Sequence, residues 1–358
     1  MQSFLVAAFA LAFSLAVLQP LSACTIFKVT RQGRTLVGNN EDDSSTETKV
    51  WFLVPEKGKY GRVFFGYSDS VPQGGMNERG LFFDWVADNP SDNWVRDAGK
   101  LNYGGSVSEK ILEEAATVDE ALVFYEIYNE TAFLKSRTML VDRSGAAAIV
   151  SWRNGRLNIE RGRSDVLAMG YAGATAQKML ERMRGLSLES VRLTLEACVQ
   201  DGEYPTQYSN LYDLQHGDVY VYSFLRKQPF VRLNLSEELS KGNHYYSIPR
   251  IATQVLQTPM TDHKTQPVAA VDPAIYAAYA GRYRIEADDY VFTISTESGR
   301  IYFEARDVSR TEFYPASATR FFVRMLEVWI TFKTGEDGRA REAVFHVRGK
   351  DKPAIRME

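Results

Sequence analysis

The order of strand-like and helical segments is the feature that most constrains how this chain can fold. Strand-like runs come first, two helical stretches follow, and strands, helices and strands then return in that order. The strand-like runs are 25–30, 35–38, 50–54, 62–67, 81–87, 137–142, 146–152, 156–160, 165–169, 206–213, 218–224 and 230–235, and the helical stretches are 107–116, 118–128, 176–184 and 188–200. This order predicts a layered α+β domain over residues 24–250.

The composition changes after this domain. Residues 251–272 are rich in Gln, Thr, Pro, Ala and Asp without periodicity, which predicts a linker. Short alternating runs follow at 281–285, 290–296, 300–305, 320–324, 328–332 and 343–347. We therefore expect a small all-β domain over residues 273–358, folded as a barrel or a sandwich.

The N-terminus indicates export. Residues 4–18 form an uninterrupted apolar run, which has the length of a signal-peptide core but is short for a membrane span. Pro20 follows the run, and Cys24 comes shortly after it. We interpret residues 1–23 as an export signal, although their N-terminal part lacks Lys and Arg. Because no later segment resembles a membrane helix, we expect a periplasmic or extracellular protein.

Composition excludes several classes of partner and cofactor. The 358 residues carry a formal net charge of -3, and no basic stripe or nucleic-acid motif is present. The four histidines are scattered without metal-ligand spacing, so no metal or cofactor is expected. They are His216, His244, His263 and His346. The expected partner is a small molecule, and homo-oligomer formation stays an open alternative.

Cys24 becomes the first residue of the mature chain if the export signal is removed after residue 23. A free α-amine has a pKa of about 8 and a thiol one of about 8.5, so the amine can take the thiol proton directly or through water. One residue then supplies both nucleophile and base for attack on an amide carbonyl. The other cysteine, Cys198, lies in an amphipathic helical pattern and is expected to be a small buried core residue.

The polar segment after the first hairpin supplies candidate partners for Cys24. A hairpin returns the chain toward its start, so Asn39, Asn40 and Asp42 can lie beside Cys24. Asp42 could hold the α-ammonium or orient the thiol, and Asn39 or Asn40 could donate to a substrate carbonyl. From local sequence alone, a simple polar turn is the more common interpretation.

The residues around this hairpin resemble a known family of amidases. Cys24-Thr25-Ile26-Phe27, followed by Gly38-Asn39-Asn40-Glu41-Asp42, is similar to the opening of the choloylglycine hydrolase and penicillin V acylase family. Further stretches match in order up to about residue 249; they begin at Gly75, Met139 and Tyr208. The resemblance implies an N-terminal nucleophile hydrolase with an αββα sandwich, which cleaves a linear amide of a small N-acylated substrate.

The sequence also departs from that family. Its members usually carry an arginine after the hairpin glycine, where this chain has Asn39. The family's other polar site positions fall near Ala87, Met169 and Gln177, although Asp88 or Asn89 could fill part of that space. Cys24 and Asp42 carry over, and Asn40 also matches. The resemblance therefore implies a divergent member with its own substrate.

Two other interpretations remain open from sequence. An acyltransferase would use the same Cys24 thioester with an amine acceptor. Alternatively, residues 21–24 fit a bacterial lipobox, in which case a lipidated Cys24 would anchor a lipoprotein or a non-catalytic binding module. Strand-like sequence begins directly after Cys24, however, whereas lipid anchors usually precede a flexible polar tether.

Overall fold

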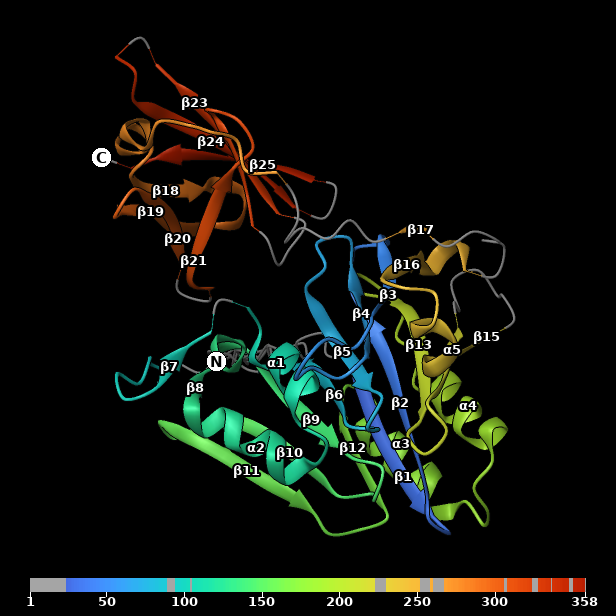
Figure 1. Ribbon diagram of the computed structural model, residues 1–358. Helices are drawn as coiled ribbons and strands as arrows, with labels where there is room; N and C mark the ends of the chain where they lie inside the picture. The colour runs from blue at the N-terminus through green and yellow to red at the C-terminus, as the bar shows by residue number, and fades with distance from the viewer. Residues whose placement is uncertain are drawn as a thin grey trace, which may run out of the picture.

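The computed structural model describes residues 24–88, 94–103, 105–222, 230–251, 258–259, 267–305, 308–323, 328–335, 337–347 and 350–357 (Figure 1). The predicted export signal lies outside the described residues, as do Asn89 and most of the predicted linker.

Among the described residues, six strands form one antiparallel sheet, which we call sheet A. Its order is β12-β1-β2-β13-β14-β15, and its strands are β1 (Thr25–Arg31), β2 (Arg34–Asp42), β12 (Val166–Gly170), β13 (Thr206–Asp213), β14 (Asp218–Tyr222) and β15 (Val231–Asn234). The β1–β2 hairpin turns at Gln32 and Gly33, which both have positive φ. Two successive residues of positive φ match the right-handed twist of the flanking strands. This hairpin places the end of β2 beside the start of β1.

Nine described strands form the second sheet, sheet B, in the order β11-β10-β9-β6-β5-β4-β3-β16-β17. They are β3 (Thr48–Leu53), β4 (Arg62–Tyr67), β5 (Pro72–Asn77), β6 (Phe82–Ala87), β9 (Ser136–Val141), β10 (Ala147–Arg153), β11 (Arg156–Gly162), β16 (His244–Ser247) and β17 (Thr258–Pro259). The short β17 lies within the predicted linker and pairs with β16. That part of the linker therefore adds an edge strand to sheet B.

The two sheets pack face to face, and helices cover their outer faces (Figure 1). Helices α1 (Val107–Glu114) and α2 (Val118–Ile127) pack on sheet B, whereas α3 (Gly173–Arg182) and α4 (Leu188–Ala197) pack on sheet A. Shorter elements are β7 (Leu101–Asn102), β8 (Tyr128–Asn129), η1 (Thr131–Leu134), α5 (Leu235–Leu239) and η3 (Ile248–Arg250). The side chains of Ser106, Thr117 and Ser187 cap the first turns of α1, α2 and α4 by accepting backbone N–H groups.

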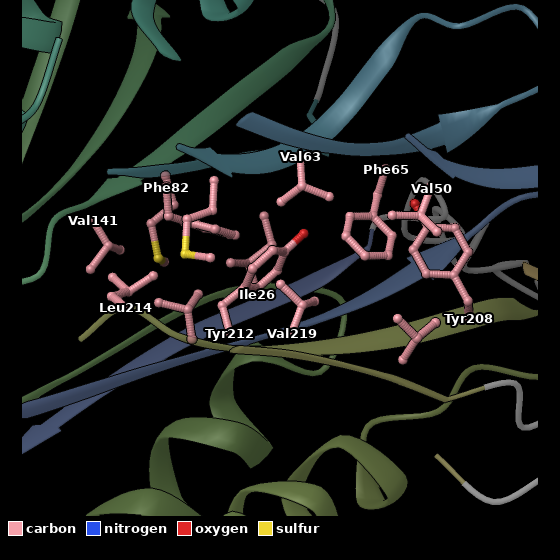
Figure 2. Packing of buried hydrophobic residues seen from close by; sticks show 14 of the residues in the cluster. Ile26, Val50, Val63, Phe65, Phe82, Val141, Tyr208, Tyr212, Leu214 and Val219 are labelled. Atoms are coloured by element: carbon pink, nitrogen blue, oxygen red, sulfur yellow. The ribbon is translucent and has the colours of Figure 1, made fainter. Parts of the chain in front are cut away.

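A hydrophobic core fills most of the space between the sheets. Ile26 and Tyr212 from sheet A meet Val63 and Phe82 from sheet B, and the rings of Phe82 and Tyr212 pack edge to face at 4.9 Å (Figure 2). Each buried side chain of this size contributes roughly 1.5–3 kcal/mol through the hydrophobic effect. The opposite faces of the strands pack against the helices, so both sheets are buried on two sides and cannot shift register freely.

The C-terminal domain is a closed barrel of eight described strands. They are β18 (Gly281–Ile285), β19 (Tyr290–Glu297), β20 (Arg300–Ala305), β21 (Val308–Pro315), β22 (Arg320–Phe322), β23 (Trp329–Thr334), β24 (Ala340–Val347) and β25 (Lys350–Arg356), preceded by the short helix η4 (Pro273–Ala278) and with η5 (Glu286–Asp288) between the first two. Pairing of β18 with β25 closes the barrel. Its interior is filled by aromatic rings such as Tyr283, Phe292 and Phe332.

The predicted mixed α+β fold and the separate all-β domain are confirmed. Strands β5, β16, β21 and β25 were not predicted, nor were the two-residue strands β7, β8 and β17. The sequences of β5 and β25 resemble loops. Gly74 and Gly75 lie inside β5, and β25 carries charged residues and Pro353. Gly74 is required where it lies, since a Cβ there would overlap the carboxyl of Asp84 on β6.

Gly170 should be essential for stability and for the position of Cys24. Its φ is +98°, and a Cβ there would overlap the carbonyl oxygen of Cys24. We expect Gly170→Ala to lower the free energy of unfolding by about 2–5 kcal/mol, combining left-handed strain with overpacking. Gly155 has a φ of +74° with nothing near its Cβ position, so Gly155→Ala should cost only about 1–2 kcal/mol. Urea unfolding of both variants measures this difference; equal losses would contradict it.

Candidate functional site

Cys24 lies immediately before β1, which pairs with β12 and β2 in sheet A. The next residue, Thr25, pairs with Asn40 of β2 on one side and with Gly170 of β12 on the other. The side chain of Cys24 faces sheet B, packs in the same core cluster as Ile26 and Met169, and is only 8% exposed. The first residue of the predicted mature chain is therefore held by sheet pairing and packing rather than by a free tail.

The thiol of Cys24 contacts the main chain of Asp42. The Asp42 N–H donates to Sγ at 3.4 Å, and the thiol lies 4.0 Å from the Asp42 carbonyl oxygen. The hairpin therefore brings the end of β2 to Cys24, as the sequence predicts. A backbone N–H that points at sulfur favours the thiolate and fixes the direction of the side chain.

The carboxyl group of Asp42 is buried and only half satisfied. Its Oδ1 accepts a hydrogen bond from Thr206 Oγ1 at 2.6 Å, and its Oδ2 has no hydrogen-bond partner among the described residues. Burial raises the pKa of Asp42 from 3.8 to about 7, and the Thr206 hydrogen bond opposes part of that rise. Asp42 can therefore hold or release a proton near neutral pH.

The two predicted asparagines face opposite sides of sheet A. Asn40 donates to the Leu195 carbonyl of α4 at 2.9 Å and accepts from Ser209 Oγ at 2.5 Å. Its amide is thus bonded on the helix-covered face. Asn39 lies on the inner face, where its Nδ2 is 3.4 Å from Glu41 Oε2 and its Oδ1 has no partner among the described residues. This placement favours Asn39 over Asn40 as a substrate donor.

Two further carboxyls, Glu41 and Asp84, lie near Cys24 and were not predicted. Glu41 accepts a hydrogen bond from the Tyr67 hydroxyl at 3.2 Å, which links β2 to β4 across the space between the sheets. Burial raises the pKa of Glu41. Asp84 is fully buried on β6, and burial followed by the charge of Glu41 raises its pKa well above the usual range. In sequence, each residue resembles an ordinary polar position of a strand.

These surroundings disfavour a thiolate in the unprocessed chain. Burial is the largest cause that raises the pKa of Cys24 well above its usual range, and the charges of Glu41, Asp42 and Asp84 raise it further. The hydrogen bond from Asp42 N–H opposes this rise. Cys24 is joined to residue 23 in the chain as given, so its nitrogen is a neutral peptide nitrogen.

Other positions considered from sequence do not lie at this site as catalytic groups. Met169 packs in the core, Gln177 bonds Glu181 on the surface of α3, and Asp88 forms an ion pair with Arg153. Ala87 is exposed, and Asn89 lies outside the described residues. Cys198 is buried, and neither cysteine forms a disulfide.

Two cavities lined by described residues lie away from Cys24. A cavity of about 360 Å³ is lined by residues such as Gly80, Arg143 and Leu214, and Leu214 N–H bonds the carbonyl of Thr35 near the β1–β2 turn. This is the end of sheet A opposite Cys24. Among the described residues, no group of three or more His, Cys, Asp or Glu side chains is arranged to hold a metal ion. None of the described helices has the length and apolar character needed to span a membrane.

Solved structures share the fold. Penicillin V acylase from Agrobacterium tumefaciens matches with a TM-score of 0.54 at 16% identity, over 66% of this chain and 98% of that chain. An arginine-to-leucine variant of conjugated bile acid hydrolase from Clostridium perfringens matches with a TM-score of 0.51 at 16% identity, over 67% of this chain and 99% of that chain. A cysteine-to-alanine variant of the same hydrolase matches with a TM-score of 0.50 at 16% identity, over 70% of this chain and 100% of that chain. At these identities the likeness shows the fold alone.

The C-terminal part has a different relationship. Residues 265–356 match the family described as "Domain of unknown function (DUF3471)". A stretch of 89 residues of this chain, for which no position is assigned, is 38% identical to penicillin-binding protein 4* of Bacillus subtilis; it makes up 25% of this chain and only 19% of that protein. The barrel thus matches a family model of its own, separate from the fold likeness to the acylases.

The raised pKa of Asp42 predicts a pH-dependent effect of Asp42→Asn in the unprocessed chain. Between its unfolded pKa of 3.8 and its folded pKa of about 7, only the folded state holds the proton. Wild-type stability from this group is therefore full below pH 3.8 and falls as pH rises to about 7. The variant lacks this loss, so its stability relative to wild type should rise over that range and then level off. Thermal unfolding across pH measures the difference; a constant difference would contradict the raised pKa.

Proposed function

We propose that this protein is an exported hydrolase that cleaves a linear N-acyl amide bond with Cys24, after removal of residues 1–23. The main supporting observation is the position of the Cys24 thiol, which lies directly before β1 and accepts a hydrogen bond from the Asp42 N–H. The charges of three carboxyls act on this thiol. The helix–sheet–sheet–helix layering and the fold likeness to penicillin V acylase and conjugated bile acid hydrolase support an N-terminal nucleophile amidohydrolase.

Processing would reverse the electrostatics at Cys24. Cleavage before Cys24 replaces a neutral peptide nitrogen with an α-amine that is charged when protonated. The neighbouring carboxylates would hold that ammonium, and its charge would lower the pKa of the carboxyls and of the thiol. The features that suppress a thiolate in the unprocessed chain would then orient the base of the mature enzyme. Asp42 is the residue that we assign to this positioning role.

The chemistry then follows in two steps. The α-amine takes the thiol proton, and Sγ attacks the amide carbonyl carbon. The C–N bond breaks as the α-ammonium returns that proton to the leaving amine, which leaves a thioester on Cys24. Water attacks the thioester and gives a proton to the α-amine; the C–S bond breaks, and the thiolate recovers the proton. Asn39 Nδ2 and the Tyr208 hydroxyl are our candidates to donate to the carbonyl oxygen in the transition state.

The placement of Cys24 argues against the lipoprotein alternative. Its Sγ packs inside the core cluster between the sheets, and β1 begins at the next residue. A diacylglyceryl group on this sulfur would have to lie outside the core, so Cys24 and the start of β1 would have to move out with it. An acyltransferase, in contrast, would use the same geometry, with an amine in place of water in the second step.

Replacing Cys24 should abolish amide turnover without unfolding the protein. We expect Cys24→Ala and Cys24→Ser to lose at least about 1000-fold in kcat, because the nucleophile itself is removed or weakened. Cys198→Ala is the matched control, since Cys198 is a buried free thiol on the helix side of sheet A. It should keep its activity per folded molecule. Turnover that survives Cys24→Ala would refute the assignment of this site.

The mature N-terminus separates the proposal from its alternatives. Intact mass and N-terminal sequencing of the exported protein should give an unmodified chain that begins at Cys24, because only a free amine can act as the base. Recovery of a diacylglyceryl-modified Cys24 would rule out the hydrolase. Adding amine acceptors to the assay distinguishes hydrolysis from acyl transfer, because only an acyltransferase converts the thioester into a new amide in preference to the acid.

A further inference from the structure

The surroundings of Cys24 contain acceptors that have no donors. Buried polar groups in proteins are almost always hydrogen-bonded, because each unpaired group costs about 1–3 kcal/mol. Six buried polar atoms near Cys24 have no hydrogen-bond partner among the described residues. They are Asn39 Oδ1, Asp42 Oδ2, Asp84 Oδ1, Asp84 Oδ2, Asn210 Oδ1 and the hydroxyl oxygen of Tyr208. When the carboxyls are ionised, five of the six can only accept hydrogen bonds, and we call the six atoms the acceptor cluster.

The neutral members of the acceptor cluster are directed at its carboxyls. The amide of Asn39 lies on the carboxylate of Glu41. The charges of Glu41 and Asp84 both raise the pKa of Tyr208, so its hydroxyl lies near them. Asn210 donates at 3.0 Å to the Tyr212 hydroxyl, and Asp84 and Glu41 likewise raise the pKa of Tyr212. The amide of Asn39 and the hydroxyl of Tyr208 therefore lie beside the carboxyls of Glu41 and Asp84 on the inner face of sheet A.

The described groups that mainly perturb these acids and Cys24 include no positively charged side chain. Among the described groups that shift the pKa values of Cys24, Glu41, Asp42 and Asp84, none is a lysine, an arginine or a histidine. Nor are these acids grouped as metal ligands in the part of the chain that the structure describes. Burial without a positive charge raises the pKa of Glu41 and Asp84 and so favours their protonated forms. A ligand that brings both positive charge and several N–H groups would satisfy the cluster.

We propose that the acceptor cluster beside Cys24 binds a cationic, N–H-rich group of the substrate, so that the enzyme prefers N-acyl amides of diamines to those of neutral or anionic amines. This inference rests on the proposed amide hydrolysis at Cys24. The α-ammonium of the mature chain carries one positive charge, and a second cation would favour ionisation of a further carboxyl, because a nearby positive charge opposes the raised pKa of Glu41 and Asp84. Cys24 and Asp42 are each 8% exposed and the other members less, so the ligand would enter past the nucleophile.

Three amides with one acyl chain and matched four-carbon amines test the charge preference. N-octanoylputrescine, N-octanoylbutylamine and N-octanoyl-4-aminobutyrate differ mainly in a terminal group that is cationic, neutral or anionic. We expect kcat/KM of the mature protein to be at least about tenfold higher for the cationic amide than for the neutral one, with the anionic one lowest; tenfold corresponds to about 1.4 kcal/mol. A neutral or anionic amide as the best substrate would overturn the inference while amide hydrolysis stands.

Isosteric variants test whether the carboxyls set the preference. Asp84→Asn should reduce the ratio of cationic to neutral kcat/KM by about tenfold, and Glu41→Gln carries the same expectation if Asp84→Asn does not fold. Glu130→Gln is the matched control: Glu130 is a buried carboxyl outside the cluster, its pKa is raised to about 7 by burial, and it caps η1. It should leave the ratio unchanged. An unchanged ratio in both cluster variants would overturn the inference.

Binding to the Cys24→Ala variant separates this inference from the proposed function. If wild type hydrolyses none of the three amides, calorimetry on Cys24→Ala decides. Affinity that falls from the cationic to the neutral to the anionic amide, and weakens with a second Asp84→Asn change, would support the inference and refute hydrolysis of these amides. Affinity without that order, or no binding of the cationic amide, would overturn the inference.

Discussion

The pairing of β1 with β2 is the interaction on which the candidate site depends. Its register places Thr25 opposite Asn40 and carries the Asp42 N–H to the sulfur of Cys24. Because β1 is paired with a strand on each side, its position is fixed, and so is the position of Cys24 beside it. One hydrophobic core packs against each face of sheet A, and the two cores together keep the strand register from shifting. The same pairing also places the inner-face carboxyl of Glu41 next to Cys24.

The candidate site contains buried, unpaired polar groups, whereas the sheets around it are stabilised by hydrophobic packing. The hydrophobic core between the sheets consists of aliphatic and aromatic side chains such as Val63 and Phe65 (Figure 2). Three carboxyls and several unpaired amide or hydroxyl groups are buried at this site. Such groups lower stability unless a proton, a cation or a ligand satisfies them. The hydrophobic packing of both sheets offsets that cost elsewhere in the molecule. An arrangement that is costly in the free protein and satisfied only by processing or binding is typical of functional sites.

The sequence predicted the strands and helices around the site better than it predicted the polar residues that line the site. β4 and β13 were predicted with their observed bounds, because strands with clear propensity between turn residues carry a strong local signal. Cys24 and Asp42 were brought together as predicted, because a hairpin is local. Asp84 escaped prediction because it lies in β6 among apolar neighbours, and periodicity cannot tell which sheet face meets another layer. Asn210 and Tyr208 escaped for the same reason, since their role depends on packing between distant strands.

The asparagine after the hairpin glycine and the uncompensated acids are best understood together. Asn39 lies on the inner face with its amide against Glu41, so an arginine there, as the resemblance leads one to expect, would lie against that carboxylate. Its charge would lower the pKa of Glu41 and neutralise one of the acids. Asn39 instead offers one neutral hydrogen bond of 3.4 Å, and burial keeps the pKa of Glu41 raised. Burial without a nearby positive charge therefore favours the protonated form of these acids. The α-ammonium of Cys24 provides one positive charge after processing, and a cationic substrate group would provide the next.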